Sequence, residues 1–243
     1  MAQFNIGTAT DDELYARWQE QIERIRTETT YLFTTRFRWR EVVKMFEYNQ
    51  ALNKVGGPAY QWLLGIWGRD AIMAVRRELD DQHGAVNLVH MLHEIEKRPQ
   101  VLTRRRYLAH IKPSDPDFLT ETMNEDFNRF GCVTTPGGDP DEDHIDPTVV
   151  RADRQHLQEE ASATFEYAQQ MVAHRTPIDK LEIQISDIHR AIDAIHPVLR
   201  KYYVILTGNG IATSEAAFQY HWKEAFEHVW ANSEYYERLR TEA

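Results

Sequence analysis

The feature that most constrains the fold is a heptad pattern in the C-terminal half of the chain. Apolar residues recur there at alternating intervals of three and four, in the order Ile178, Leu181, Ile185, Ile188, Ile192, Ile195, Leu199, Tyr202 and Leu206. On an α-helix such a series forms one apolar stripe, which packs against neighbouring helices inside a bundle or across a helical dimer interface. Thr176 and Pro177 supply a cap and a first-turn residue, and Pro197 should kink the helix because it lacks a backbone donor.

Caps and apolar periodicity predict helices along the rest of the chain as well. Thr10 and Glu13 have the spacing of a capping box, so the first helix is expected to begin near residue 11. Further helices are expected over about 36–49, 58–81, 85–97, 116–127, 147–174, 176–206 and from 213 onward. We therefore predict an all-α fold, a helical bundle of about eight helices in a single domain over residues 1–243. Gly, Pro and Asp mark a flexible acidic loop at about 131–148.

The composition is that of a globular protein, with 42% hydrophobic and 27% charged residues. No apolar run approaches the roughly 20 residues that a spanning helix needs, and the N-terminal residues lack a basic start followed by an apolar stretch. Cys132 is the single cysteine, so no internal disulfide can form. These features predict a cytoplasmic protein without a membrane segment.

The net charge of -10 repels a phosphate backbone at long range, so nucleic-acid binding would require a local basic patch. Two short stretches offer one. Arg36, Arg38 and Arg40 alternate with aromatic residues, and the run 104–106 consists of three arginines. Either stretch can contact RNA phosphate, although solvated helix faces are the interpretation that we favour for both.

Three groups of residues bear on metal binding. His221, Glu224 and His228 share one face of the expected last helix, and His83, His90 and His93 form a second group. The carboxylates of the acidic loop have neither the glycine nor the last ligand of a calcium loop. Packing, surface and solvated-loop roles are favoured for these groups, and we expect no metal and no cofactor.

Three amphipathic segments follow one another in a distinctive order. They are RFRWREVVKMFEYN (36–49), WGRDAIMAVRRELDDQHGAVNLVHMLHEIEKRP (67–99) and YAQQMVAHRTPIDKLEIQISDIHRAIDAIHPVLRKYYVILTG (167–208). Together, and above all in the turn AHR-x-P before the long amphipathic helix, they resemble the HEPN-like proteins of the abortive-infection U type. The resemblance extends over roughly residues 10–207.

The resemblance implies a helical bundle that forms a homodimer and acts in bacterial antiphage defence or in a toxin–antitoxin system, where a neighbouring gene can supply a partner protein. Active HEPN proteins are metal-independent ribonucleases that use an arginine followed, four to six residues later, by a histidine. The corresponding histidine is His174, but residues 167–169 hold no basic side chain where the arginine is expected. The candidate catalytic residues are therefore His174 with Arg175 or Arg190.

The spacing alone does not identify the site, because four other pairs satisfy it: Arg77 with His83, Arg104 with His110, Arg151 with His156, and Arg190 with His196. A structural role as a helix C-terminal residue is the alternative for His174. Two further functions stay open beside the RNA-directed one. They are a non-catalytic dimerising interaction module, acting as antitoxin or scaffold, and a helical metal protein.

Overall fold

The computed structural model describes residues 5–49, 57–82, 84–112, 114, 116, 118–134, 137–173, 182–211 and 221–227. Within them lie the helices α1 (Asp11–Tyr48), α3 (Gly57–Leu79), α4 (Leu88–Lys97), α5 (Arg104–Leu108), α6 (Phe118–Arg129), α7 (Pro147–Glu160), α8 (Ser162–Tyr167) and α9 (Ile185–Thr207). Two short strands, β1 (Cys132–Val133) and β2 (His144–Ile145), pair antiparallel. The prediction of an all-α helical bundle is thus confirmed.

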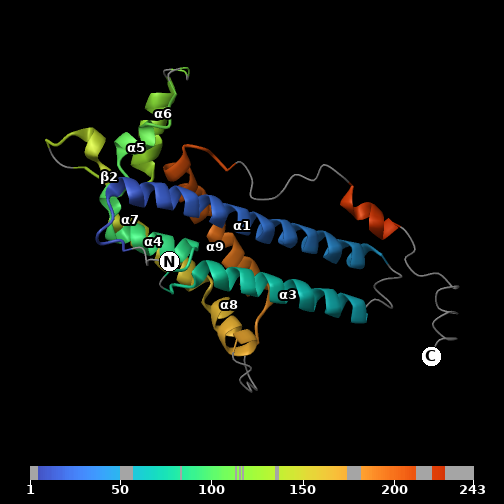
Figure 1. The fold of residues 1–243 in the computed structure, drawn as a ribbon. Coiled ribbons are helices and arrows are strands. Elements are labelled where there is room, and N and C mark those ends of the chain that lie inside the picture. The colour runs from blue at the N-terminus through green and yellow to red at the C-terminus, as the bar shows by residue number, and fades with distance from the viewer. Residues whose placement is uncertain are drawn as a thin grey trace, which may run out of the picture.

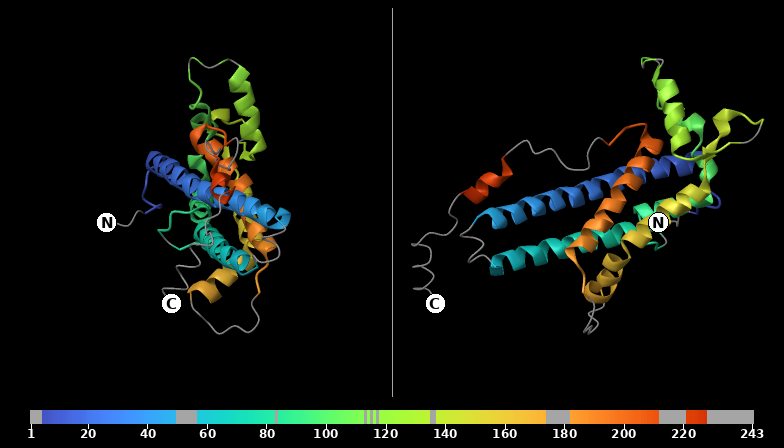
Figure 2. Two further views of the ribbon diagram at one scale, coloured as in Figure 1. Left: turned by 90° about the vertical axis from the view of Figure 1, so that its right-hand side faces the viewer. Right: turned by 180° about the vertical axis from the view of Figure 1, so that it is seen from behind.

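Three long helices set the architecture. Helices α1 and α3 lie side by side, and α9 crosses both of them (Figures 1 and 2). Helices α4 and α7 pack together beside the first half of α1, and α5, α6 and the two strands gather at the same end of the molecule (Figure 1). The second half of α1 and the first half of α3 extend beyond the crossing with α9. On that side of the crossing, α9 and α1 meet at an angle.

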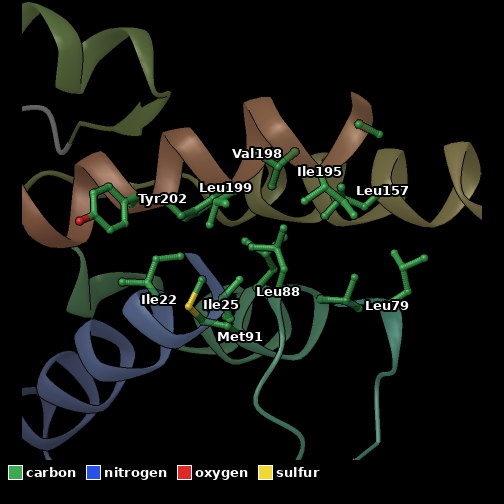
Figure 3. Packing of buried hydrophobic residues seen from close by; sticks show 14 of the residues in the cluster. Ile22, Ile25, Leu79, Leu88, Met91, Leu157, Ile195, Val198, Leu199 and Tyr202 are labelled. Atoms are coloured by element: carbon green, nitrogen blue, oxygen red, sulfur yellow. The ribbon is translucent and has the colours of Figure 1, made fainter. Parts of the chain in front are cut away.

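The heptad stripe of α9 forms the centre of the core. Ile188, Ile192, Ile195, Leu199 and Tyr202 are each at most 3% exposed. Figure 3 shows Ile195, Leu199 and Tyr202 facing side chains from α1 and α4. Burying each such apolar side chain stabilises the fold by about 1.5–3 kcal/mol. From Ile188 to Leu206 the stripe is buried within one chain, so a homodimer would have to use another surface.

The first helix is longer than predicted. It begins at Asp11, where Thr10 and Glu13 form the expected capping box, but it continues to Tyr48, so the separate helix predicted over 36–49 was wrong. Thr29 and Thr30 lie between the two predicted segments. Their hydroxyl groups donate to the carbonyl oxygens of Ile25 and Arg26, 2.8 and 2.7 Å away, so these threonines are accommodated inside the helix.

Two predicted helices have different limits. The helix predicted over 147–174 ends at Glu160, because Ala161 leaves the helical conformation before α8 and a π-helical turn at Ala168–Ala173. The helix predicted from 176 begins at Ile185, where the backbone N–H of Gln184 donates to Asp187. It continues through Pro197. Residues 174–181 lie outside the described residues, as does most of the helix predicted from 213, of which a 3-10 turn at Trp222–Glu227 is described.

Helix α9 ends where the sequence predicts, at Gly208. This residue has a φ of 68°, a left-handed conformation that favours glycine. A side chain at position 208 would also collide with His110, which follows α5 in the chain. A Cβ atom added to Gly208 would lie 2.4 Å from the His110 Cβ. Gly208 therefore fixes both the end of α9 and its approach to residue 110.

Candidate functional site

One side of α9 carries a row of histidine, aspartate and arginine residues. His189, Asp193, His196 and Arg200 are spaced by four, three and four residues, so they share one side of the helix, directly beside the buried stripe. Arg36 of α1 interacts with this row. We call the group the α1–α9 corner, and its members are Arg36, Arg40, His189, Asp193, His196 and Arg200.

Arg36 is the most buried member of the corner, at 7% exposed. Its Nη1 donates to Asp193, and its guanidinium carbon lies 5.5 Å from the centre of the Phe33 ring. The Nε of Arg36 is buried and has no hydrogen-bond partner in the part of the chain that the structure describes. Because a guanidinium has five N–H donors, Arg36 keeps donor capacity for a further acceptor.

His189 lies at the side of the corner that faces α3. Its ring centre is 5.4 Å from that of Trp67, and its buried Nδ1 has no hydrogen-bond partner among the described residues. Burial, followed by the guanidinium groups of Arg40 and Arg36, lowers the pKa of His189, and Asp193 opposes the shift. The imidazole is therefore neutral near pH 7.

His196 occupies the second imidazole position, two helical turns further along α9. Its ring meets the Phe33 ring edge-on, with 5.5 Å between the centres and an angle of 83° between the planes. Burial, followed by Arg200 and Arg36, lowers its pKa, again against the effect of Asp193. Two imidazoles with lowered pKa values thus interact with one buried guanidinium.

Carboxylates do not balance the positive charge of this corner. Arg40 and Arg200 are exposed, and neither forms an ion pair with a described residue. Asp193, whose side chain is 62% exposed, is the carboxylate that interacts with Arg36 and with both imidazoles. Three guanidinium groups and two imidazoles around one exposed carboxylate favour the binding of an anion, and phosphate oxygens are preferred partners of arginine.

Of the three catalytic candidates predicted from the sequence, the structure describes one. His174 and Arg175 lie outside the described residues, so their roles stay predictions. Arg190 is exposed on α9 and forms an ion pair with Asp187. It lies six residues before His196, which separates the two side chains by about 120° around the helix, so Arg190 is not part of the α1–α9 corner.

The arginine run 104–106 has become part of the structure instead of a free basic patch. Arg104 is buried and donates to Asp143 at 3.1 Å, Arg105 pairs with Asp139 and Glu142 at 3.3 and 2.7 Å, and Arg106 pairs with Asp12 at 2.6 Å. The favoured interpretation of a solvated helix face was therefore wrong for Arg104, and that of a solvated acidic loop was wrong for Asp143. We call this group the α5 corner, with the members Asp12, Arg104, Arg105, Arg106, Asp139, Glu142 and Asp143.

The alternating arginines of α1 divide between two faces. Arg36 and Arg40 belong to the α1–α9 corner, whereas Arg38 lines a groove of about 340 Å³ between α1 and α3. This groove is largely apolar, and Tyr31 and Ile66 at its edge are exposed. The sequence therefore contained the relevant arginines but not their separation onto different faces.

The other arginine–histidine pairs form no shared site within the described residues. Arg77 pairs with Glu28, and Arg151 pairs with Glu96, while His83 lies outside the described residues. His110 interacts with the hydroxyl group of Tyr15 at 3.1 Å, away from the ion pairs of Arg104. The spacing rule alone thus selects residues that serve separate structural contacts.

The metal candidates are placed as follows. His90 and His93 lie beside Asp81, with nitrogen–oxygen distances of 3.6 and 3.2 Å, and His90 also approaches Glu94 at 3.5 Å. Glu94 in turn accepts a 2.9 Å hydrogen bond from the Trp18 ring, so this group ties α4 to α1. His83 and His228 are outside the described residues, within which no group of three or more potential ligands is placed to hold a metal ion.

Comparison of the chain with protein-family models, with curated proteins and with solved structures gives no match. Among the described helices, none is both long and apolar enough to span a membrane. The chemistry of the α1–α9 corner and the resemblance of the three sequence segments are the indications of function that the molecule offers.

Proposed function

We propose that this is a HEPN-like protein of bacterial antiphage defence that acts on RNA, and that the α1–α9 corner contacts the RNA phosphate backbone. The observation that carries the RNA-directed part is the buried Arg36 between His189 and His196. The helical bundle is compatible with the family that the three sequence segments resemble. The net charge of -10 makes a local excess of positive charge the feature required for such binding.

The leading form of this function is metal-independent RNA cleavage. In that reaction one neutral imidazole takes the proton of the ribose 2'-hydroxyl, whose oxygen then attacks the adjacent phosphorus. The bond from phosphorus to the 5'-oxygen breaks, and the departing oxygen receives a proton from the second histidine in its imidazolium form. Arg36 would stabilise the charge on the phosphorane oxygens. His189 and His196 are seven residues apart on α9, about 10.5 Å along its axis, so this step requires the phosphodiester to lie between the two rings.

Cleavage of a labelled single-stranded RNA in the presence of a metal chelator tests this proposal. The variants His189→Ala and His196→Ala should each lower the rate by about 100-fold or more, since general acid–base groups typically contribute that much. His156→Ala is the matched control, because His156 is an exposed histidine of α7 outside the corner. Full cleavage by both corner variants would remove the corner from the reaction.

The same assay separates this site from the one that the resemblance assigns. If His174→Ala abolishes cleavage while the His189 and His196 variants retain it, the chemistry belongs to His174. If all three variants lose activity, the two regions act together. Circular dichroism spectra of the variants must match that of the wild-type protein for either outcome to count.

A binding subunit without catalysis is the second candidate function. The observation that favours it is that both imidazoles have lowered pKa values, so the imidazolium form needed as general acid is the minor form at the corner near pH 7. This form predicts RNA binding that depends on Arg40 and Arg200 and no cleavage at any pH between 5 and 8. Cleavage that requires His189 or His196 would exclude it.

A further inference from the structure

The contact between Arg36 and Asp193 differs from an ordinary structural ion pair. Arg36 is almost fully buried, whereas the Asp193 side chain is 62% exposed. The carboxylate therefore reaches the guanidinium from the solvent side. A rotation of the Asp193 side chain alone is sufficient to separate the pair.

An anion from outside the protein would interact most favourably with the corner if it took the place of the Asp193 carboxylate. This carboxylate is bonded to Arg36 and interacts with His189 and His196 on either side. Arg40 and Arg200 stand beyond the two imidazoles and have no carboxylate partner among the described residues. A phosphate group offers oxygens of similar geometry to a carboxylate and accepts from arginine in the same way.

We infer that Asp193 is an internal counter-anion that occupies a phosphate-binding site, and that a phosphate ester binds there by displacing the Asp193 carboxylate from Arg36. The Nε of Arg36 is a further buried donor without a partner in the described chain, so Asp193 does not saturate this guanidinium. The inference deepens the proposed function by naming the ligand chemistry and the residue that competes with it. It does not require that the protein cleave RNA.

The charged groups that face the site set its pH dependence. They are Arg36 and Arg40 from α1, and Asp193, Arg200 and the two histidines from α9, while α3 contributes the uncharged Trp67. The arginines stay charged throughout, so a bound phosphate gains further positive partners when the imidazoles are protonated. Inorganic phosphate itself loses negative charge over this range, so the effect is measured on a phosphodiester, whose charge is constant: its affinity should rise as the pH falls from 7.5 to 5.5.

Binding of inorganic phosphate, followed by NMR signals of the His189 and His196 rings, tests the inference. In the wild-type protein phosphate should shift both signals in a saturable manner. Asp193→Asn, which keeps the shape of the side chain but removes its charge, should bind phosphate about 3- to 10-fold more tightly. Asp193→Ser serves as a second variant, with the same expected direction.

Glu121→Gln is the matched control, because Glu121 is an exposed carboxylate of α6 at the far end of the molecule. It removes the same charge and should leave the affinity within 1.5-fold of the wild-type value. Equal affinity in wild-type protein, Asp193→Asn and Asp193→Ser would overturn the inference, and so would the absence of phosphate-dependent shifts at both histidines.

Two oligonucleotides distinguish the sources of the phosphate. A short RNA with a 5'-phosphate and the same RNA with a 5'-hydroxyl are each competed against inorganic phosphate. Tighter binding of the first identifies a terminal phosphate as the ligand, and equal binding identifies the internal phosphodiester; both support the inference. If neither RNA competes but phosphate binds with the expected Asp193 dependence, the phosphate site stands and the proposed RNA-directed function fails.

Discussion

Arg36 and Arg104 are buried to the same extent, at 7% exposed, yet their surroundings differ in kind. Arg104 uses its whole guanidinium: Nε donates to the Pro140 carbonyl, Nη1 to Asn124, and Nη2 to Asn128 and to the buried Asp143. Arg36 has the exposed Asp193 and a buried Nε without a partner among the described residues.

The difference indicates that burial alone does not separate a structural arginine from a binding one. In the α5 corner three arginines meet four carboxylates, so no positive charge is left for a ligand. In the α1–α9 corner three arginines and two imidazoles meet Asp193. The number of carboxylates around each arginine, and how firmly they are held, decides whether an outside anion can compete.

The largest expected effect is on stability, and it contrasts the two partner carboxylates. Asp143→Asn leaves the charge of Arg104 buried without compensation, so the free energy of unfolding should fall by about 3–5 kcal/mol. Asp193→Asn also takes the carboxylate from a buried arginine, but this carboxylate is 62% exposed, so water can take its place and the expected loss is smaller, about 1–2 kcal/mol. Urea denaturation of both variants, followed by circular dichroism, measures the two values.

Equal losses in the two variants would break the comparison. Asn keeps the volume of Asp at both positions, so neither variant creates a cavity, and the backbone carbonyl at 143 can still accept the 2.8 Å hydrogen bond from the Arg104 N–H. The difference between the variants therefore reports the surroundings of the two arginines and little else.

The next expected effect concerns RNA affinity. Replacing both Arg40 and Arg200 by alanine should weaken RNA binding about 10-fold and reduce the slope of log K against log salt by about 1.4, which is roughly 0.7 for each lost phosphate contact on a single strand. The matched control is the double variant Arg105→Ala, Arg129→Ala, whose members pair with carboxylates. Fluorescence anisotropy at several salt concentrations gives both quantities, and equal slopes in the two double variants would contradict the assignment of the corner.

Sequence reasoning succeeded where the determinants are local. The capping box at Thr10 and Glu13 placed the start of α1, and Gly208 placed the end of α9, because both depend on a few adjacent residues. It failed over 29–36, where the apolar pattern weakens but threonine hydroxyl groups donate to backbone carbonyl oxygens of the same helix. It also failed at the start of α9, because the continuous heptad pattern obscured the cap that Gln184 and Asp187 form there.

The candidate site was beyond local reasoning for a different reason. Arg36 and Asp193 are separated by 157 positions, and they meet because α9 crosses α1. His189 and His196 were visible as histidines one residue after the apolar stripe, at the seven-residue spacing of one face. What the sequence did not contain was the crossing that places Arg36 between them, and the same holds for Arg104 and Asp143 in the α5 corner.

The smallest expected effect is on the pH dependence of stability. Because the folded-state pKa values of His189 and His196 are lowered, the unfolded chain binds protons more readily than the folded chain as the pH falls below about 6.5. The contribution of these residues is therefore fully present above that pH and is lost as the pH falls through their folded-state pKa values. The α5 corner is built from arginines and carboxylates and contains no histidine.

The double variant His189→Gln, His196→Gln should accordingly lose less stability than the wild-type protein when the pH is lowered from 7.5 to 5.5. Thermal unfolding at both pH values measures this difference, and His156→Gln should behave as the wild-type protein does. The pKa of His90 is raised chiefly by its hydrogen bond to Glu94, so its contribution has the opposite sign, and burial lowers the pKa of His110. Both residues are present in every sample, so their contributions cancel in the comparison. An unchanged pH dependence in the double variant would mean that the imidazoles of the corner are not held neutral by burial and by Arg36. The α1–α9 corner would then have lost this physical difference from the α5 corner.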